Sequence, residues 1–108
     1  MGRENSAGLS YGIEPRGEGR FAVSGALTLA TAASALAAGD RAFAAVHSVE
    51  IDLSGVVAAD SAGLAVLLEW VRAAKMQGRC LRLHSMPPML AAIVGICDVE
   101  AVLRAAEA

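Results

Sequence analysis

The sequence has few of the residue types that usually carry enzyme chemistry. It contains two histidines, His47 and His84, and neither has a cysteine or an aspartate at a spacing that indicates a catalytic triad or a metal site. The two cysteines, Cys80 and Cys97, fit no zinc motif and are too few for a disulfide framework. We therefore expect buried free thiols, no metal, no cofactor and no enzyme activity, and a small enzyme is the least supported alternative.

The sequence also lacks the features of several kinds of binding protein. The net charge is -2, so no basic surface is predicted for nucleic acid, and no helix is rich enough in lysine or arginine to attract anionic lipid. Trp70 is the only tryptophan, and one aromatic ring does not make a platform for stacking bases. The glycines are isolated, which excludes a glycine-rich phosphate loop and argues against nucleotide binding.

The remaining composition is that of one folded domain. The chain has 108 residues, of which 56% are hydrophobic and 19% charged, and this balance excludes disorder. We expect a flexible N-terminus over residues 1–8 and a single domain over residues 9–108. The uncharged segment 21–39 is predicted to be a strand and an alanine-rich helix, because a signal peptide or membrane span would have different flanks and larger side chains.

A central stretch organises the predicted fold. Residues 49–53 alternate apolar and acidic side chains, which predicts a strand with one buried face, and Gly55 is expected to end it. Asp60 and Ser61 are both good N-cap residues, and an apolar helical pattern follows them. Gly78 is the predicted C-terminal cap of that helix.

Flanking patterns predict the other elements. A strand at 9–14, ended by Pro15, and a strand at 21–27 are expected to form a hairpin. A helix is predicted from Thr31 to Ala45, and a break near Gly39 is expected because glycine costs about 1 kcal/mol inside a helix.

The second half continues the alternation of strands and helices. A strand is predicted over Cys80–His84, then a helix that is capped by Ser85, begins at two prolines and ends at Gly95. Asp98 is a candidate cap for a last short helix. This alternation predicts an α/β fold with crossover connections.

Two segments of the central stretch carry a family resemblance. The runs Ile51-Asp52-Leu53-Ser54-Gly55 and Asp60-Ser61-Ala62-Gly63-Leu64, with the gap between them and the order of elements, resemble the STAS domain of bacterial anti-sigma factor antagonists. The resemblance covers about residues 11–103. It implies a STAS fold, a mixed four- to five-stranded sheet with helices packed against it. Similar domains end sulfate transporters and form a small subunit of Mla-type phospholipid ABC transporters.

Ser61 has two possible roles. It matches the family position that a partner kinase phosphorylates, and a phosphate at a helix N-terminus is stabilised by the free N–H groups there. The plain alternative is an N-cap, worth about 1 kcal/mol. Ala62 departs from the anti-sigma pattern, which usually has a second serine. The form Asp-Ser-Ala-Gly-Leu, and the strand and Pro-Pro helix start over 83–90, look more like the Mla transporter subunit.

The helix after Ser61 is predicted to carry a docking face. If Leu64, Leu67, Leu68 and Val71 face the sheet, the opposite side is small and apolar apart from one glutamate. An exposed helix normally carries more charge, so we expect a partner there, although chance in an alanine-rich chain is the alternative. The predicted partner-binding residues are Asp60, Ser61, Ala62, Val66, Glu69, Trp70 and Ala73.

The resemblance implies a function that these residues could serve. It is that of a non-enzymatic accessory subunit that binds the cytoplasmic ATPase of a phospholipid-transporting, Mla-type ABC complex. Such a subunit would be cytoplasmic and would meet the inner membrane only through the transporter. The alternative is an anti-sigma factor antagonist that binds a serine kinase and loses affinity once Ser61 is phosphorylated.

Overall fold

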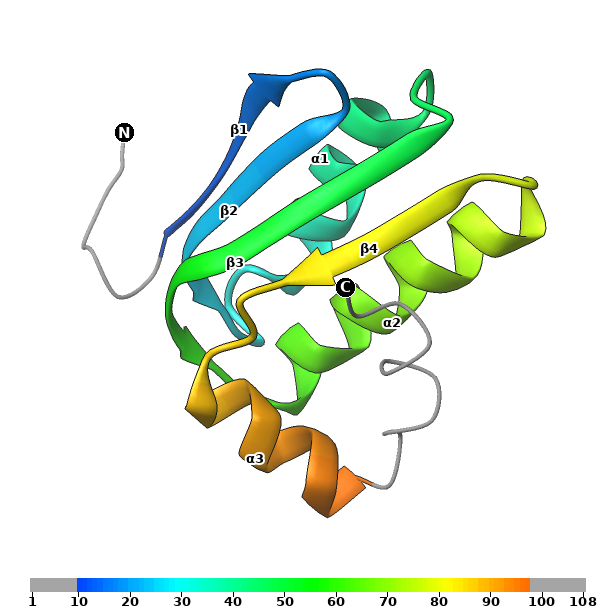
Figure 1. The fold of residues 1–108 in the computed structure, drawn as a ribbon. Coiled ribbons are helices and arrows are strands. Elements are labelled where there is room, and N and C mark those ends of the chain that lie inside the picture. Colours follow the sequence, from blue (N-terminus) through cyan, green and yellow to red (C-terminus); the bar gives the residue numbers. More distant parts are fainter. Residues whose placement is uncertain (1–9, 98–108) are drawn as a thin grey trace.

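The computed structural model describes residues 10–97, with side chains described as far as residue 93. The expected flexible segment 1–8 and the predicted short helix from Asp98 lie outside the described residues. The elements follow one another along the chain as shown in Figure 1: β1 (Tyr11–Gly17), β2 (Arg20–Leu27), α1 (Ala32–Phe43), β3 (Ser48–Ala59), α2 (Ser61–Met76), β4 (Cys80–His84) and α3 (Pro88–Cys97).

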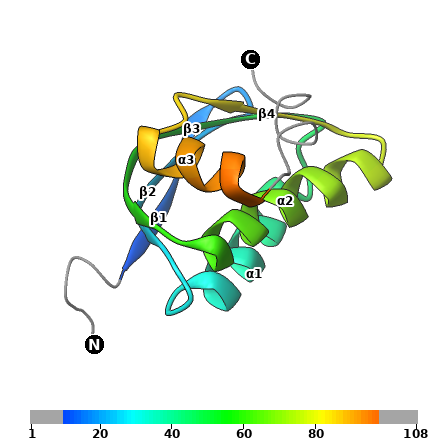
Figure 2. The same cartoon turned by 90° about the horizontal axis from the view of Figure 1, so that it is seen from below.

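The four strands form one mixed sheet in the order β1-β2-β3-β4. β1 and β2 form the predicted antiparallel hairpin, while β2 with β3 and β3 with β4 are parallel. Helices α1, α2 and α3 lie on one side of the curved sheet, as Figure 2 shows. The predicted α/β class, with helices packed against a mixed sheet, is therefore confirmed, with four strands within residues 10–97.

The core lies between this sheet and the helices. Alternate residues of β3 (Val49, Ile51 and Leu53) are buried, as the pattern predicts. Aromatic rings join the layers: Phe43 of α1 meets Phe21 of β2 with ring centroids 4.9 Å apart and Trp70 of α2 at 5.2 Å, both edge to face.

Two predicted strand ends are wrong. β3 continues through Gly55 to Ala59, because a glycine here lets β2 and β3 approach closely: a Cβ on Gly55 would lie 2.9 Å from the Cβ of Ser24. β1 likewise continues through Pro15, which pairs with Phe21. β1 is an edge strand, where proline is tolerated because one side of the strand forms no ladder bonds.

The helix predicted over 31–45 is observed as α1 (Ala32–Phe43), without the expected break at Gly39. A Cβ on Gly39 would collide with the indole ring of Trp70. Glycine is thus accommodated in mid-helix because it lets α1 approach the tryptophan of α2, and this packing offsets its low helix propensity.

The later elements follow the sequence with local corrections. Gly78, with a φ of 70°, ends α2 as predicted, and β4 has the predicted bounds. α3 continues through Gly95. The carbonyl of Pro87, rather than the side chain of Ser85, accepts the N–H groups of Leu90 and Ala91 in its first turn. Cys80 is exposed, in contrast to the expected buried thiol.

Within residues 10–97, none of the helices combines the length and the apolar character that crossing a bilayer would require.

Candidate docking site at the start of helix α2

Asp60 is the N-cap of α2, and its carboxylate holds two segments together. Its backbone is extended, and Oδ1 accepts the N–H groups of Ala62 at 2.9 Å and Gly63 at 3.1 Å. Oδ2 accepts the N–H of Leu29 at 3.0 Å, in the loop between β2 and α1. The bond from Leu29 is the largest cause that lowers the pKa of Asp60, ahead of the bonds from Gly63 and Ala62, while desolvation opposes the shift.

Ser61 is the first residue of α2 and its side chain is exposed. Of the two N-cap candidates in the sequence, Asp60 takes the role. Among the residues that the structure describes, no group forms a hydrogen bond with the Ser61 hydroxyl. A free hydroxyl therefore stands at the positive end of a sixteen-residue helix, accessible to another molecule.

A shallow apolar groove of about 270 Å³ lies beside Ser61, between α1 and α2. Of the residues with described side chains, Glu69 is the only charged one that lines it, and its Oε1 lies 3.5 Å from Nε of Arg72. The other lining residues are alanines and branched aliphatic side chains: Ala32, Ala33, Leu36, Ala62, Ala65 and Val66. Small side chains on both walls would let another surface come close to the helix backbones.

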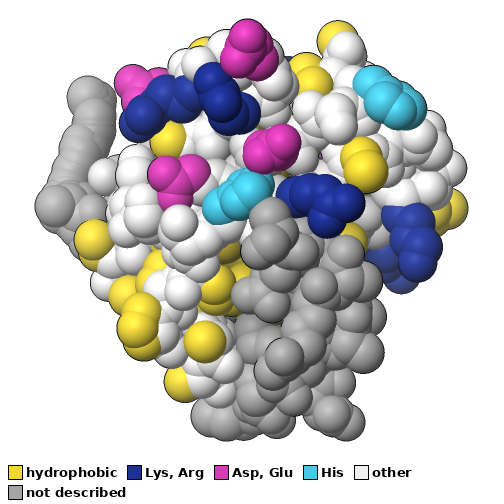
Figure 3. Space-filling model, in the orientation of Figure 1, with side chains coloured by type: hydrophobic (Ala, Val, Ile, Leu, Met, Phe, Trp, Pro, Cys, Tyr) yellow, Lys and Arg dark blue, Asp and Glu magenta, His cyan; other side chains and the backbone are white. Residues whose placement is uncertain are grey.

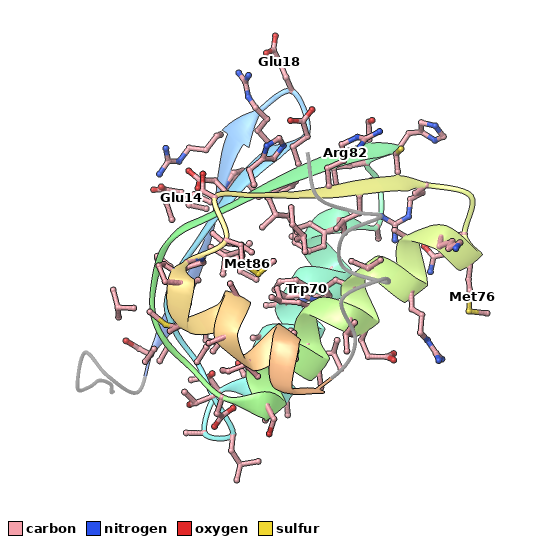
Figure 4. All side chains as sticks on the ribbon, turned by 60° about the horizontal axis from the view of Figure 1, so that its bottom comes forward. Glu14, Glu18, Trp70, Met76, Arg82 and Met86 are labelled. Atoms are coloured by element: carbon pink, nitrogen blue, oxygen red, sulfur yellow. The ribbon has the colours of Figure 1, made fainter. Side chains whose placement is uncertain are left out.

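The predicted docking face needs a correction at Val66 and Trp70. Their exposed fractions are only 3% and 1%, so neither side chain faces outward. The reason is that α2 buries two sides, one against the sheet and one against α1, where Trp70 meets Phe43 and Gly39. Figure 4 shows Trp70 directed into the interior. Val66 forms part of the groove, and Trp70 is a core residue.

The other predicted docking residues remain at the surface. Ser61 and Glu69 are exposed, and Asp60, Ala62 and Ala73 are half-buried. Sequence reasoning missed the contribution of α1, which supplies Ala32, Ala33 and Leu36 to the groove. The uncharged, alanine-rich run 32–38 was the available signal for it.

The open face of the sheet forms a second, polar hollow of about 520 Å³. Figure 3 shows charged and histidine side chains gathered over this face. They are largely paired with one another: Nε2 of His84 lies 2.8 Å from Oε1 of Glu50, and Arg16 and Arg20 contact glutamates of the hairpin. The groove differs in this respect, because the Ser61 hydroxyl beside it has no partner among residues 10–97.

Asp52 and Asp60 have separate structural roles. Oδ1 of Asp52 accepts the N–H of Ser54 at 2.9 Å, so this carboxylate binds local backbone. This bond is the main cause that lowers the pKa of Asp52. Asp60 binds the backbone of α2 and of the β2–α1 loop. Among the described residues, no three histidine, cysteine or acidic side chains are grouped to hold a metal.

A family model described as "Mlab, STAS domain" matches residues 14–104 of this sequence. The chain belongs to the STAS domain family. STAS domains are generally non-catalytic. No curated protein matches this STAS domain in sequence.

Two solved structures share the fold of this STAS domain. The anti-sigma factor antagonist SpoIIAA in its unphosphorylated form aligns with a TM-score of 0.62 at 15% identity, over 81% of this chain and 83% of that one. The Bacillus cell fate determinant SpoIIAA in its phosphorylated form aligns with a TM-score of 0.67 at 14% identity, over 92% and 89% of the two chains. At these identities the likeness establishes the STAS fold alone.

Proposed function

We propose that this STAS domain is a non-enzymatic accessory subunit that binds the cytoplasmic ATPase of a phospholipid-transporting, Mla-type ABC complex. The match to the Mlab STAS family supports this class of partner. The observation that carries the proposal is the exposed hydroxyl of Ser61, which has no hydrogen-bond partner among the described residues, beside a largely apolar groove. The contact surface consists of Asp60, Ser61, Ala62, Glu69 and Ala73 together with the groove walls.

The chemistry of this surface suits a protein partner. The centre of a protein interface is depleted of charge, because each ionised group buried without a partner costs free energy. Both carboxylates of the surface are already engaged, Asp60 with three backbone N–H groups and Glu69 with Arg72. A partner that covers them would leave little charge uncompensated. The ATPase would bind the folded domain and not the unfolded chain. The free energy of this binding would also stabilise the assembly of subunit and ATPase.

In this proposal the domain works in the cytoplasm at the inner membrane and reaches the membrane only through the transporter. The ATPase holds it there by protein contacts alone. The open polar face of the sheet remains free in such a complex.

Calorimetric titration of the ATPase with three forms of the domain tests the proposal. Ser61→Ala should bind about as tightly as the wild type, because the hydroxyl has no partner within the described residues and Asp60 still caps the helix. Ser61→Glu should weaken binding by about tenfold or more, because it buries a charge in the interface.

Ser48→Glu is the matched control. It adds the same charge at an exposed serine that begins β3, at the opposite end of that strand from α2. It should bind like the wild type. Equal affinity for Ser61→Glu and the wild type would place the contact elsewhere and refute this docking site.

The second candidate function is an anti-sigma factor antagonist controlled by phosphorylation. The free hydroxyl of Ser61 and the shared fold with SpoIIAA, solved with and without phosphate, favour it. A phosphate on Ser61 would add a charge of nearly -2 at the helix N-terminus and could expel a partner by repulsion and desolvation. Intact-mass measurement after incubation with an anti-sigma factor kinase and ATP decides between the two functions. One added phosphate, absent from Ser61→Ala, supports the switch, and an unchanged mass supports the transporter subunit.

A further inference from the structure

We infer that Leu29 is the apolar anchor of this docking face and enters a hydrophobic pocket on the ATPase. The inference rests on the proposed function and adds a residue outside α2 to it. Leu29 lies in the loop between β2 and α1, and 80% of its surface is exposed. Contact between water and a large aliphatic side chain is unfavourable. A partner that covers Leu29 would remove this contact with water.

The loop that carries Leu29 is fixed from both sides. Thr31 is buried, its Oγ1 donates to the carbonyl of Ala26 at 2.8 Å, and the same oxygen accepts the N–H of Thr28 at 3.0 Å. On the other side, the N–H of Leu29 donates to Oδ2 of Asp60. A side chain on a fixed loop loses less conformational freedom on binding than one on a loose loop, which favours its use as an anchor.

Asp60 also places Leu29 next to the rest of the docking face. The same carboxylate caps α2, so the loop and the first turn of the helix are joined through one side chain. Gly63 strengthens this junction, because a Cβ there would collide with the carbonyl of Leu27 and keep α2 away from the end of β2. The backbone of Leu29 is therefore held against Asp60, the residue before Ser61, at the end of α2 where Ala62 lines the groove.

The charges around Leu29 favour a protein over a membrane as the occupant. Within the described part of the chain no lysine or arginine lines the neighbouring groove, and Arg72, the nearest to it along α2, contacts Glu69. Binding to an anionic membrane surface usually needs several basic residues beside the apolar ones. A largely uncharged protein surface with a pocket for one aliphatic side chain is the complementary partner, as expected for the ATPase of the proposed complex.

Met76 provides a matched control. It is also 80% exposed, and it projects at the C-terminal end of α2, as Figure 4 shows. The fifteen steps between Ser61 and Met76 correspond to about 22 Å along a helix axis. Leu29→Ala and Met76→Ala each remove a large, equally exposed apolar side chain, so the comparison tests chiefly the position of that side chain.

Calorimetric titration of the ATPase with both variants tests the inference. Leu29→Ala should weaken binding by about 30-fold, as at an interface hot spot, while Met76→Ala leaves it unchanged. Both variants should keep the urea midpoint of the wild type, because exposed substitutions change stability little. This comparison separates lost contact from lost folding.

Other results would overturn the inference in distinguishable ways. If Leu29→Ala binds like the wild type while Ser61→Glu does not, Leu29 is no anchor and the proposed function stands. If the wild-type domain does not bind the ATPase, both fail. If the domain sediments with vesicles of anionic phospholipid and Leu29→Ala does not, Leu29 serves a membrane instead.

Discussion

Replacing Asp60 tests whether one carboxylate holds the docking face together. In Asp60→Ala, α2 loses its N-cap, which costs about 0.5–2 kcal/mol. The N–H of Leu29 also loses its acceptor, and a hydrogen bond of this kind contributes about 1 kcal/mol. The two losses together predict a decrease of about 2 kcal/mol in the free energy of unfolding.

Asp60→Asn separates the two roles. Asparagine caps helices about as well as aspartate, because its carbonyl oxygen can accept the N–H groups of Ala62 and Gly63. Its NH₂ group cannot accept the N–H of Leu29, so the loop is released while the cap remains. We therefore expect a loss of about 1 kcal/mol, half that of Asp60→Ala.

The assay is urea unfolding at neutral pH, supplemented by a series at lower pH. A loss of 2 kcal/mol should lower the urea midpoint of Asp60→Ala by about 1 M, since small domains have slopes of about 1–3 kcal/mol per M. The pKa of Asp60 lies below its ordinary value of 3.8 in the folded state. Its stabilisation is thus complete above the unfolded-state pKa and is lost as pH falls through the folded-state pKa. The difference between wild type and Asp60→Ala should shrink in that acidic range.

Two results would contradict this role of Asp60, one at neutral pH and one in acid. If Asp60→Ala unfolds within 0.5 kcal/mol of the wild type, a margin usual for surface substitutions, the carboxylate does not organise the two segments. An unchanged difference between the two proteins down to pH 2 would also contradict it, because an ionised Asp60 could then not be the source of the stability.

Two further predictions concern the contact between α1 and α2. Gly39→Ala should lower stability by about 1 kcal/mol or more, because overpacking against Trp70 outweighs the better helix propensity of alanine, and a more stable variant in urea unfolding would contradict this contact. Trp70→Ala should cost about 3–5 kcal/mol as a core truncation. A cost within 0.5 kcal/mol in the same assay would contradict the burial of Trp70 and would favour the surface position that the sequence predicted.

Local patterns were enough to predict most elements of the fold. The bounds of β4 and the region where α2 begins follow from alternation, capping residues and helical spacing, which depend on near neighbours. Gly39, Gly55 and Pro15 were read as element ends, and the structure keeps all three inside elements. Their effect depends on the residues that pack against them, such as Trp70 against Gly39. The spacing of residues along the chain does not predict these tertiary contacts.

Only part of the candidate site could be predicted, again because local patterns do not give tertiary contacts. Asp60 and Ser61 were recognised from their place before a helical pattern, and the structure assigns the cap to Asp60. The burial of Val66 and Trp70 was missed, because α2 packs on two sides and alanine-rich α1 gave no strong apolar stripe to indicate the second. Leu29 was missed because its role depends on a hydrogen bond to a residue 31 positions away.

Hydrogen–deuterium exchange of the domain with and without the ATPase tests the docking face most directly. We expect slower exchange in the complex over residues 28–36 and 61–69, with no change over Cys80–His84 of β4. Slower exchange confined to the strands of the open sheet face, with the start of α2 unaffected, would contradict it.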